Sequence, residues 1–244
     1  MKSRTLASAA IAALASILPP LATAADAPAG PFHWDSGAVL ATDRIFRGQR
    51  QTGDNPAVSG EVKVSHDSGA YAGIWAGNLD LGPGTHTSAE IDYFAGWGRR
   101  YDKWTVNTGY LYRQRPSNTM SLDFQEATAS VAYDIGGVRP GVGVYYSWNY
   151  FQGGTTTYGY ANLRARLGDV MGTRLIGIAT AGHYDLSNRA IGDYNDIDLR
   201  VIAKRGDWEY SLGLSDTDVR PSRSGLLTRN ECGPRLRAQV LVMF

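Results

Sequence analysis

Alternation of apolar and polar residues, repeated along the chain in segments of about 10 residues or more, constrains the fold more than any other feature. In the segment NDIDLRVIAK (195–204), charged and apolar side chains occupy alternate positions over most of the length. Segments 57–65, 88–100 and 104–115 show the same period of two. Because successive side chains of a strand point to opposite faces, this pattern predicts an all-β chain.

Twelve strands are predicted, at 36–47, 57–66, 70–81, 88–100, 103–115, 122–133, 138–151, 157–167, 173–186, 195–205, 207–219 and 234–244. The connections after odd-numbered strands are mostly long, such as 48–56 and 220–233, whereas those after even-numbered strands are short. This sorting is typical of outer-membrane barrels. We therefore expect an all-β fold, a 12-stranded antiparallel transmembrane β-barrel with short periplasmic turns and longer extracellular loops.

Periodicity does not say which face points inward, so a soluble all-β domain remains an alternative. Three features favour the membrane: strands long enough for a tilted crossing, both charge signs on the polar face, and aromatic residues near strand ends. Two aromatic girdles are expected, one for each membrane interface. The turn-side girdle comprises Trp34, Trp97, Trp104, Trp208 and Phe244, and the loop-side girdle Phe46, Tyr112, Trp148, Tyr150 and Tyr158.

The N-terminus has the features of a secretory signal peptide. Lys2 and Arg4 precede an apolar stretch at 6–18, and Ala22-Thr23-Ala24 offers a cleavage site after Ala24 or Ala25. A membrane-anchoring helix is disfavoured because the run is short and is followed by two prolines. The expected organisation is a signal peptide at 1–24, removed on export, and a barrel at 25–244 in the outer membrane of a Gram-negative bacterium.

Composition excludes several classes of protein. The 24 basic and 23 acidic residues give no charge for nucleic-acid binding. One cysteine allows no disulfide framework, and four histidines supply metal chemistry poorly, so no cofactor or metal is expected. No enzyme activity is expected, because the motifs G-x-S-x-G and H-E-x-x-H are absent. A hydrolase embedded in the barrel remains an alternative, with His183 and Asp185 on one strand as its candidate pair.

Two stretches resemble known outer-membrane sequences. The C-terminal LRAQVLVMF alternates apolar residues up to Phe244 and resembles the signal read by the bacterial barrel-assembly machinery. The runs at 41–60, 65–80 and 90–97 resemble the TorF-like porins, a proteobacterial family of chains of about this length. That resemblance implies an outer-membrane barrel of the porin kind, without a defined solute. Arg44 departs from the aromatic that the family favours, and is expected near the outer end of the lipid face, where its long side chain can reach polar groups.

If the Val, Ile and Trp positions face lipid, the opposite positions line the lumen. The candidate lumen residues are Glu61, Lys63, Glu90, Asp92, Asn107, Arg113, Glu126, Arg164, Arg166, Asp198, Arg200, Arg235 and Arg237. We expect Lys63, Glu126, Arg164 and Arg200 near mid-height. Basic residues slightly outnumber acidic ones in this set, which hints at a preference for anions.

The leading hypothesis is therefore a porin-like channel through which small hydrophilic solutes diffuse. Its alternatives are the hydrolase and a closed barrel, whose paired lumen charges serve stability or whose outer loops bind a partner. The expected partners are outer-membrane lipids and lipopolysaccharide, the barrel-assembly machinery and small solutes. Arginines in the loop 220–233 are candidates for the lipopolysaccharide phosphates. Glycines 96, 98, 141 and 143 are expected to permit bends or close packing in the wall.

Overall fold

The computed structural model describes residues 30–244 except 54, 83–84, 118–120, 153, 187–191 and 221–231. The predicted signal peptide and most of the loop 220–233 lie outside the described residues. One short 3-10 helix, η1 (Tyr150–Gln152), occurs in the described part of the chain. No helix among these residues is long and apolar enough to cross a membrane.

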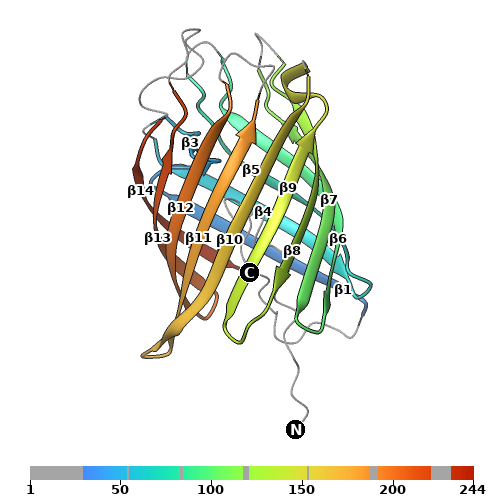
Figure 1. Cartoon of the computed structure of the whole chain (residues 1–244), viewed down its shortest axis with the longest axis vertical. Coiled ribbons are helices and arrows are strands. Elements are labelled where there is room, and N and C mark those ends of the chain that lie inside the picture. Colours follow the sequence, from blue (N-terminus) through green and yellow to red (C-terminus); the bar gives the residue numbers. More distant parts are fainter. Residues whose placement is uncertain are drawn as a thin grey trace.

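Twelve strands close into one antiparallel barrel, as predicted (Figure 1). They are β1 (Phe32–Ala41), β4 (Ala57–His66), β5 (Ala70–Asn78), β6 (Ala89–Tyr101), β7 (Trp104–Gln114), β8 (Phe124–Tyr133), β9 (Val138–Ser147), β10 (Thr156–Val170), β11 (Thr173–Asp185), β12 (Tyr194–Arg205), β13 (Trp208–Thr217) and β14 (Arg235–Met243). Each pairs with the next barrel strand, and β1 closes the ring against β14. Closure leaves no barrel strand with an unpaired edge, which a sheet in lipid requires.

The two ends of the barrel differ as expected. Tight turns join β4 to β5, β6 to β7, β8 to β9, β10 to β11 and β12 to β13 at one end, here called the short-turn end. The long connections lie at the other end, here called the loop end (Figure 1). Six of the predicted strands, β4, β6, β7, β11, β12 and β14, are displaced by no more than one residue at either boundary.

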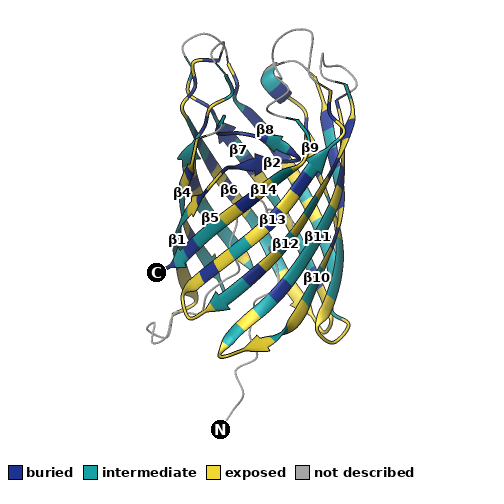
Figure 2. Ribbon diagram, turned by 90° about the vertical axis from the view of Figure 1, so that its left-hand side faces the viewer, coloured by how far each residue is buried: buried dark blue, intermediate teal, exposed yellow. Residues whose placement is uncertain are grey.

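The outer surface is apolar along the middle of the strands. Val62, Leu163, Leu199 and Leu212 are each about half exposed, whereas the residues next to them on the same strands face inward. Exposed and less exposed residues alternate along the strands in this way in Figure 2. Such a surface matches the lipid-facing band of an outer-membrane barrel. Charges in contrast concentrate on the inner face, where Lys63, Asp92, Arg113 and Glu126 are buried.

The turn-side aromatic girdle is present. Trp34, Trp104 and Trp208 project from the outer surface at the short-turn end with exposed fractions of 67%, 51% and 47%, and Phe244 is exposed as well. Trp97 lies there too, with its indole Nε1 donating to the carbonyl of Ser68 at 2.9 Å.

The loop-side girdle was predicted incorrectly in part. Tyr112 stacks on Tyr93, and Trp148 is exposed, as expected. Phe46, Tyr150 and Tyr158, however, are buried inside the barrel. Tyr158 occupies an inward position of β10, and the other two lie outside the barrel strands, where alternation gives no facing.

The first strand was also predicted incorrectly. β1 ends at Ala41 rather than at residue 47, and β4 begins at Ala57. The connection 42–56, here called the lumen segment, turns into the barrel over its described residues 42–53. This segment carries two short strands, β2 (Ile45–Phe46) and β3 (Gln49–Arg50), which form a separate two-stranded sheet. β3 is labelled in Figure 1 and β2 in Figure 2. Ala41 and Ala57 are direct partners across β1 and β4, so a short turn would suffice to join these strands. The extra length of this connection is therefore available for another purpose.

Glycines on the inner wall make room for aromatic rings. A Cβ added at Gly96 would lie 2.5 Å from both the Tyr71 hydroxyl and the carbonyl oxygen of Thr108, and one at Gly143 would lie 2.2 Å from the Tyr160 hydroxyl. These two positions confirm the expectation of close packing. Part of the glycine and tyrosine content of this chain thus has a common cause, since tyrosine rings on the inner wall pack against glycines on neighbouring strands.

We expect Gly96→Ala to lower the free energy of unfolding by about 1–3 kcal/mol, because the methyl group overlaps a backbone oxygen that cannot move freely. Gly159→Ala is the matched control, since an added Cβ there meets no atom within 4 Å. Urea unfolding of the refolded barrels would measure both. Equal stability of the two variants would show that the wall around Gly96 adapts.

Candidate functional site

The lumen segment enters the barrel as a small hairpin. Ile45 pairs with Arg50 and Phe46 with Gln49, leaving Arg47 and Gly48 as the two turn residues. Both have positive φ, 49° and 77°, which suits a two-residue hairpin turn and favours glycine at the second position. An added Cβ at Gly48 would lie 2.7 Å from the Cβ atoms of Asp196 on β12 and Thr217 on β13. The hairpin tip therefore touches the barrel wall two and three strands away from β1.

The base of the hairpin is held by its own side chains. Asp43 accepts hydrogen bonds from Arg50 and from the hydroxyl of Thr52, the latter at 2.9 Å. The amide of Gln51 donates to the carbonyl of Arg44 at 2.8 Å. These contacts shape the segment before any contact with the wall is counted.

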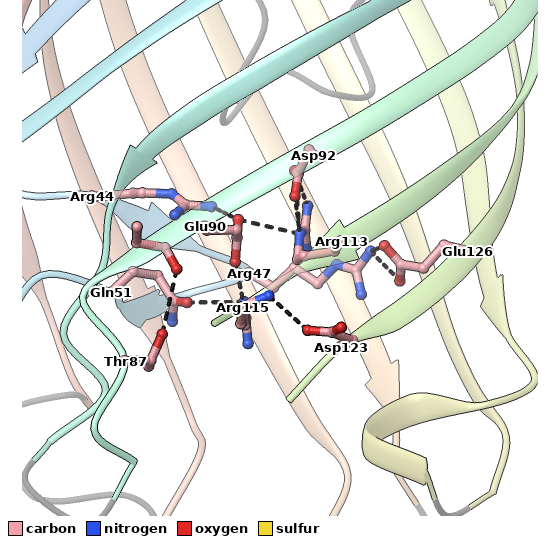
Figure 3. A network of polar contacts seen from close by, with 11 residues as sticks. Arg44, Arg47, Gln51, Thr87, Glu90, Asp92, Arg113, Arg115, Asp123 and Glu126 are labelled. Atoms are coloured by element: carbon pink, nitrogen blue, oxygen red, sulfur yellow. Dashed lines mark hydrogen bonds and ion pairs between the residues drawn. The ribbon is translucent and has the colours of Figure 1, made fainter. Parts of the chain in front are cut away.

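A buried carboxylate on β6 anchors one side of the segment. Glu90 is fully buried and forms ion pairs with Arg44, Arg113 and Arg115, the Arg113 pair at 3.2 Å (Figure 3). Arg113 also binds Asp92, with its Nε and Nη2 2.9–3.0 Å from the two carboxylate oxygens. The guanidinium groups of Arg44 in the segment and of Arg113 and Arg115 on the wall side thus surround the carboxylates of Glu90 and Asp92.

The hairpin tip is anchored by an aromatic cage. The Arg47 guanidinium lies 2.8 Å from Glu126 Oε1 on β8 (Figure 3). Its Cζ atom lies 4.4–4.8 Å from the ring centres of Phe46, Tyr145, Tyr158 and Tyr184. Cation–π contacts in such a desolvated position stabilise a charge that has little access to water.

The contacts of the lumen segment reach the whole circumference. On β5 and β7, Arg44 stacks on Trp75 at 4.3 Å and Phe46 on Arg113 at 4.5 Å. The tip reaches β9, β10 and β11 through Arg47 and β12 and β13 through Gly48. At β14, the amide of Thr42 donates to the carbonyl of Ala238 at 2.9 Å. The segment also contacts Glu90 on β6 and Glu126 on β8. Every barrel strand is thus attached to the lumen segment or touched by it, so the segment spans the lumen at this level.

The electrostatics differ at the two arginines of the segment. Burial lowers the pKa of Arg44 below its usual value, although Glu90 opposes this effect. Burial acts in the same direction on Arg47, but Glu126, Tyr184 and Tyr158 together outweigh it, and the pKa of Arg47 is raised.

The other predicted lumen residues lie away from this network. Lys63 is buried and its Nζ is 3.2 Å from Asp35, with Glu61 two residues before it on β4. Asp198 pairs with Arg200 at 2.9 Å and with Arg237 at 3.2 Å. The remaining predicted residues occupy inward positions: Arg164, Arg166, Asn107 and Arg235. Arg166 lies near the short-turn end and pairs with Asp169.

The alternation rule missed the residues of the lumen segment itself. Arg44, predicted on the lipid face, is buried in the lumen against Glu90 and Trp75, because the chain leaves the barrel wall after Ala41. Arg47, Arg50 and Gln51 were not predicted as site residues at all. The available signal was the length of the connection, together with the Arg47-Gly48 turn between residues able to pair.

The pair considered for hydrolysis does not face the lumen. His183 and Asp185 are exposed, while Tyr184 between them is buried inside. The His183 ring lies 3.0 Å from Asn195 Oδ1, on the outer side of the rim. The structure therefore does not bring this pair to the buried network of the lumen.

A closed 12-strand barrel with an apolar outer belt and a charged interior defines an outer-membrane type of β-barrel. Residues 25–239 match the model of a family described as "Bacterial protein of unknown function (Gcw_chp)", so the chain belongs to that family. The description of this family does not mention TorF-like porins, so the resemblance to those porins stays a prediction. No curated protein matches the chain.

Solved structures of outer-membrane proteins are similar in fold. OccAB4 from Acinetobacter baumannii is 10% identical with a TM-score of 0.42, covering 84% of this chain and 56% of its own. LpxR from Salmonella typhimurium is 9% identical with a TM-score of 0.49, covering 86% of this chain and 99% of its own. A chain from a study of in-meso crystallization of membrane proteins reaches a TM-score of 0.51 at 10% identity, covering 87% and 83%. This chain thus spans little more than half the length of OccAB4, and at these identities the likeness concerns the fold alone.

Proposed function

We propose that the protein is an outer-membrane channel for small hydrophilic solutes, and that the lumen segment controls its conductance. The proposal depends mainly on one observation: ion pairs and hydrogen bonds attach the lumen segment to a charged wall. No covalent chemistry is involved, and selectivity follows from the charge and width of the lumen.

The interior beneath the lumen segment supports a watery path. Glu61, Arg139 and Arg164 point inward yet keep partly accessible side chains. Charged groups of this kind need water or counter-ions around them, because burying an unpaired charge is costly. A lumen filled only to stabilise the barrel would have no need of such groups.

The contacts of the lumen segment also favour a segment that can move. Replacing buried ion pairs by apolar residues of similar size is often neutral or stabilising, so ion pairs are a poor choice for a permanent filling. Ion pairs can be exchanged for water when a segment moves, and each of the arginines Arg44 and Arg47 has its carboxylate partner on the wall. The alternative to a channel is a closed barrel whose paired interior charges only stabilise the fold.

In planar bilayers, the refolded protein is expected to show discrete conductance steps, brief in the wild type because the lumen segment occupies the lumen. Arg200→Glu is expected to shift the reversal potential toward cation selectivity, since it reverses one charge beside Asp198. Gly159→Ala, which changes no charge, is the control. Silence of well-folded wild type and of variants whose lumen segment is held less firmly would favour the closed barrel instead.

The cellular setting belongs to the same proposal. We place the barrel in the outer membrane after removal of a signal peptide, with its short-turn end in the periplasm and its loop end outside. The exposed Phe244 at the end of the chain would be available to the barrel-assembly machinery. Lipopolysaccharide would contact the outer belt and the arginines of the loop 220–233, most of which lies outside the described residues.

A further inference from the structure

Four inward-facing arginines occupy a single row of the barrel wall. Following the strand register from β9 to β14, Arg139 lies opposite Arg164, Arg164 opposite Ile178, Ile178 opposite Arg200, Arg200 opposite Gly213, and Gly213 opposite Arg237. We call Arg139, Arg164, Arg200 and Arg237 the arginine row. Neighbouring strands lie about 4.8 Å apart, so the row extends across roughly 24 Å of wall.

The arginine row climbs along the lumen. Arg139 is the second residue of β9, next to the short-turn end, whereas Arg237 is the third residue of β14, near the loop end. The residue after Arg237, Ala238, bonds to Thr42 of the lumen segment. Because barrel strands are tilted by roughly 35–45°, a row that follows the hydrogen bonds is a ramp rather than a ring. This ramp leads from the short-turn mouth to the lumen segment.

The acidic residues balance this row only in part. Asp198 pairs with both Arg200 and Arg237. Asp134 attracts Arg139 and Glu209 attracts Arg164, but Asp134 forms its ion pair with Arg100 and Glu209 with Lys204. Among the described residues, no carboxylate lies within ion-pair distance of Arg139 or Arg164. Like charges placed directly opposite on neighbouring strands are destabilising, so the Arg139–Arg164 pairing costs stability unless an anion lies between them.

We infer that Arg139 and Arg164 form a binding site for small anions bearing a carboxylate or phosphate group, and that the arginine row guides such anions along the lumen. Guanidinium groups bind both kinds of oxyanion through paired hydrogen bonds. Both side chains are partly accessible, so an anion entering from the short-turn end can reach them. The inference rests on the proposed channel function for its purpose, but binding itself needs no conduction.

The test measures equilibrium binding of inorganic phosphate and of succinate, each alone, to the refolded full chain by titration calorimetry. The double variant Arg139→Gln/Arg164→Gln is expected to lose roughly tenfold or more in affinity for at least one probe, because charge-assisted hydrogen bonds are removed. Arg99→Gln/Arg205→Gln is the matched control, since it removes the same charge from two exposed arginines at the short-turn end.

Equal affinities of the two double variants, or a folded wild type that binds neither probe, would overturn the inference. Binding that the first double variant loses and the control keeps would support it even if no current is recorded. In that case the proposed channel fails while the anion site stands. Which probe binds more tightly separates phosphate-bearing from carboxylate-bearing solutes.

Discussion

Replacing residues 42–56 by a four-residue turn is expected to give a barrel that conducts continuously and several times more strongly than the wild type. Ala41 and Ala57 are already partners, so the turn closes β1 and β4 without disturbing their register. The substitution removes the contacts of Arg47 that reach across the lumen to β8, β9 and β10. The remaining wall is charged, and water will fill it. Single-channel recording measures the change.

The wild type refolded and reconstituted in parallel is the control, with circular dichroism and urea unfolding showing that both barrels are folded. The variant without residues 42–56 also loses Arg44 and Arg47, which leaves Glu90 and Glu126 with fewer partners. Some loss of stability is therefore expected, but Arg113 and Arg115 still neutralise Glu90. A folded variant that conducts no better than the wild type would show that the lumen segment does not limit conduction.

Glu90→Gln is expected to destabilise the folded chain by about 3–5 kcal/mol, the usual cost of breaking a buried ion pair. Glutamine keeps the shape but removes the charge that Arg44, Arg113 and Arg115 share. Arg113 keeps Asp92 as a partner, whereas Arg44 and Arg115 lose their ion pair. Urea unfolding in detergent micelles or bilayers measures the loss.

Two outcomes of this substitution can be separated. If the segment stays in place, the loss appears as a lower free energy of unfolding. If it leaves the lumen, residues 42–56 become sensitive to protease and conductance rises. Glu209→Gln is the control, since Glu209 pairs at 2.7 Å with the more accessible Lys204, far along its strand from the lumen segment. Wild-type stability, protease resistance and conductance in Glu90→Gln would contradict the role of this cluster.

The strands were predictable because lipid and a polar interior impose opposite requirements on alternate residues. A strand such as β12 must present Ile197, Leu199 and Val201 to one side and charged groups to the other, and its bounds follow within a residue. The inward facing of Lys63, Asp92, Arg113 and Glu126 followed from the same rule. The pairing of these charges did not, because partners on other strands depend on the register of the whole sheet.

The sequence by itself determined the number of strands, the sorting of turns and loops, and the face on which charges lie, because all three depend on local periodicity and connection length. Only the tertiary structure decided that residues 42–56 turn inward and that Arg47 lies among three tyrosines from β9, β10 and β11. It also decided that four arginines, spread from residue 139 to 237, form one row. Such contacts join positions far apart in the chain, and barrel closure alone brings them together.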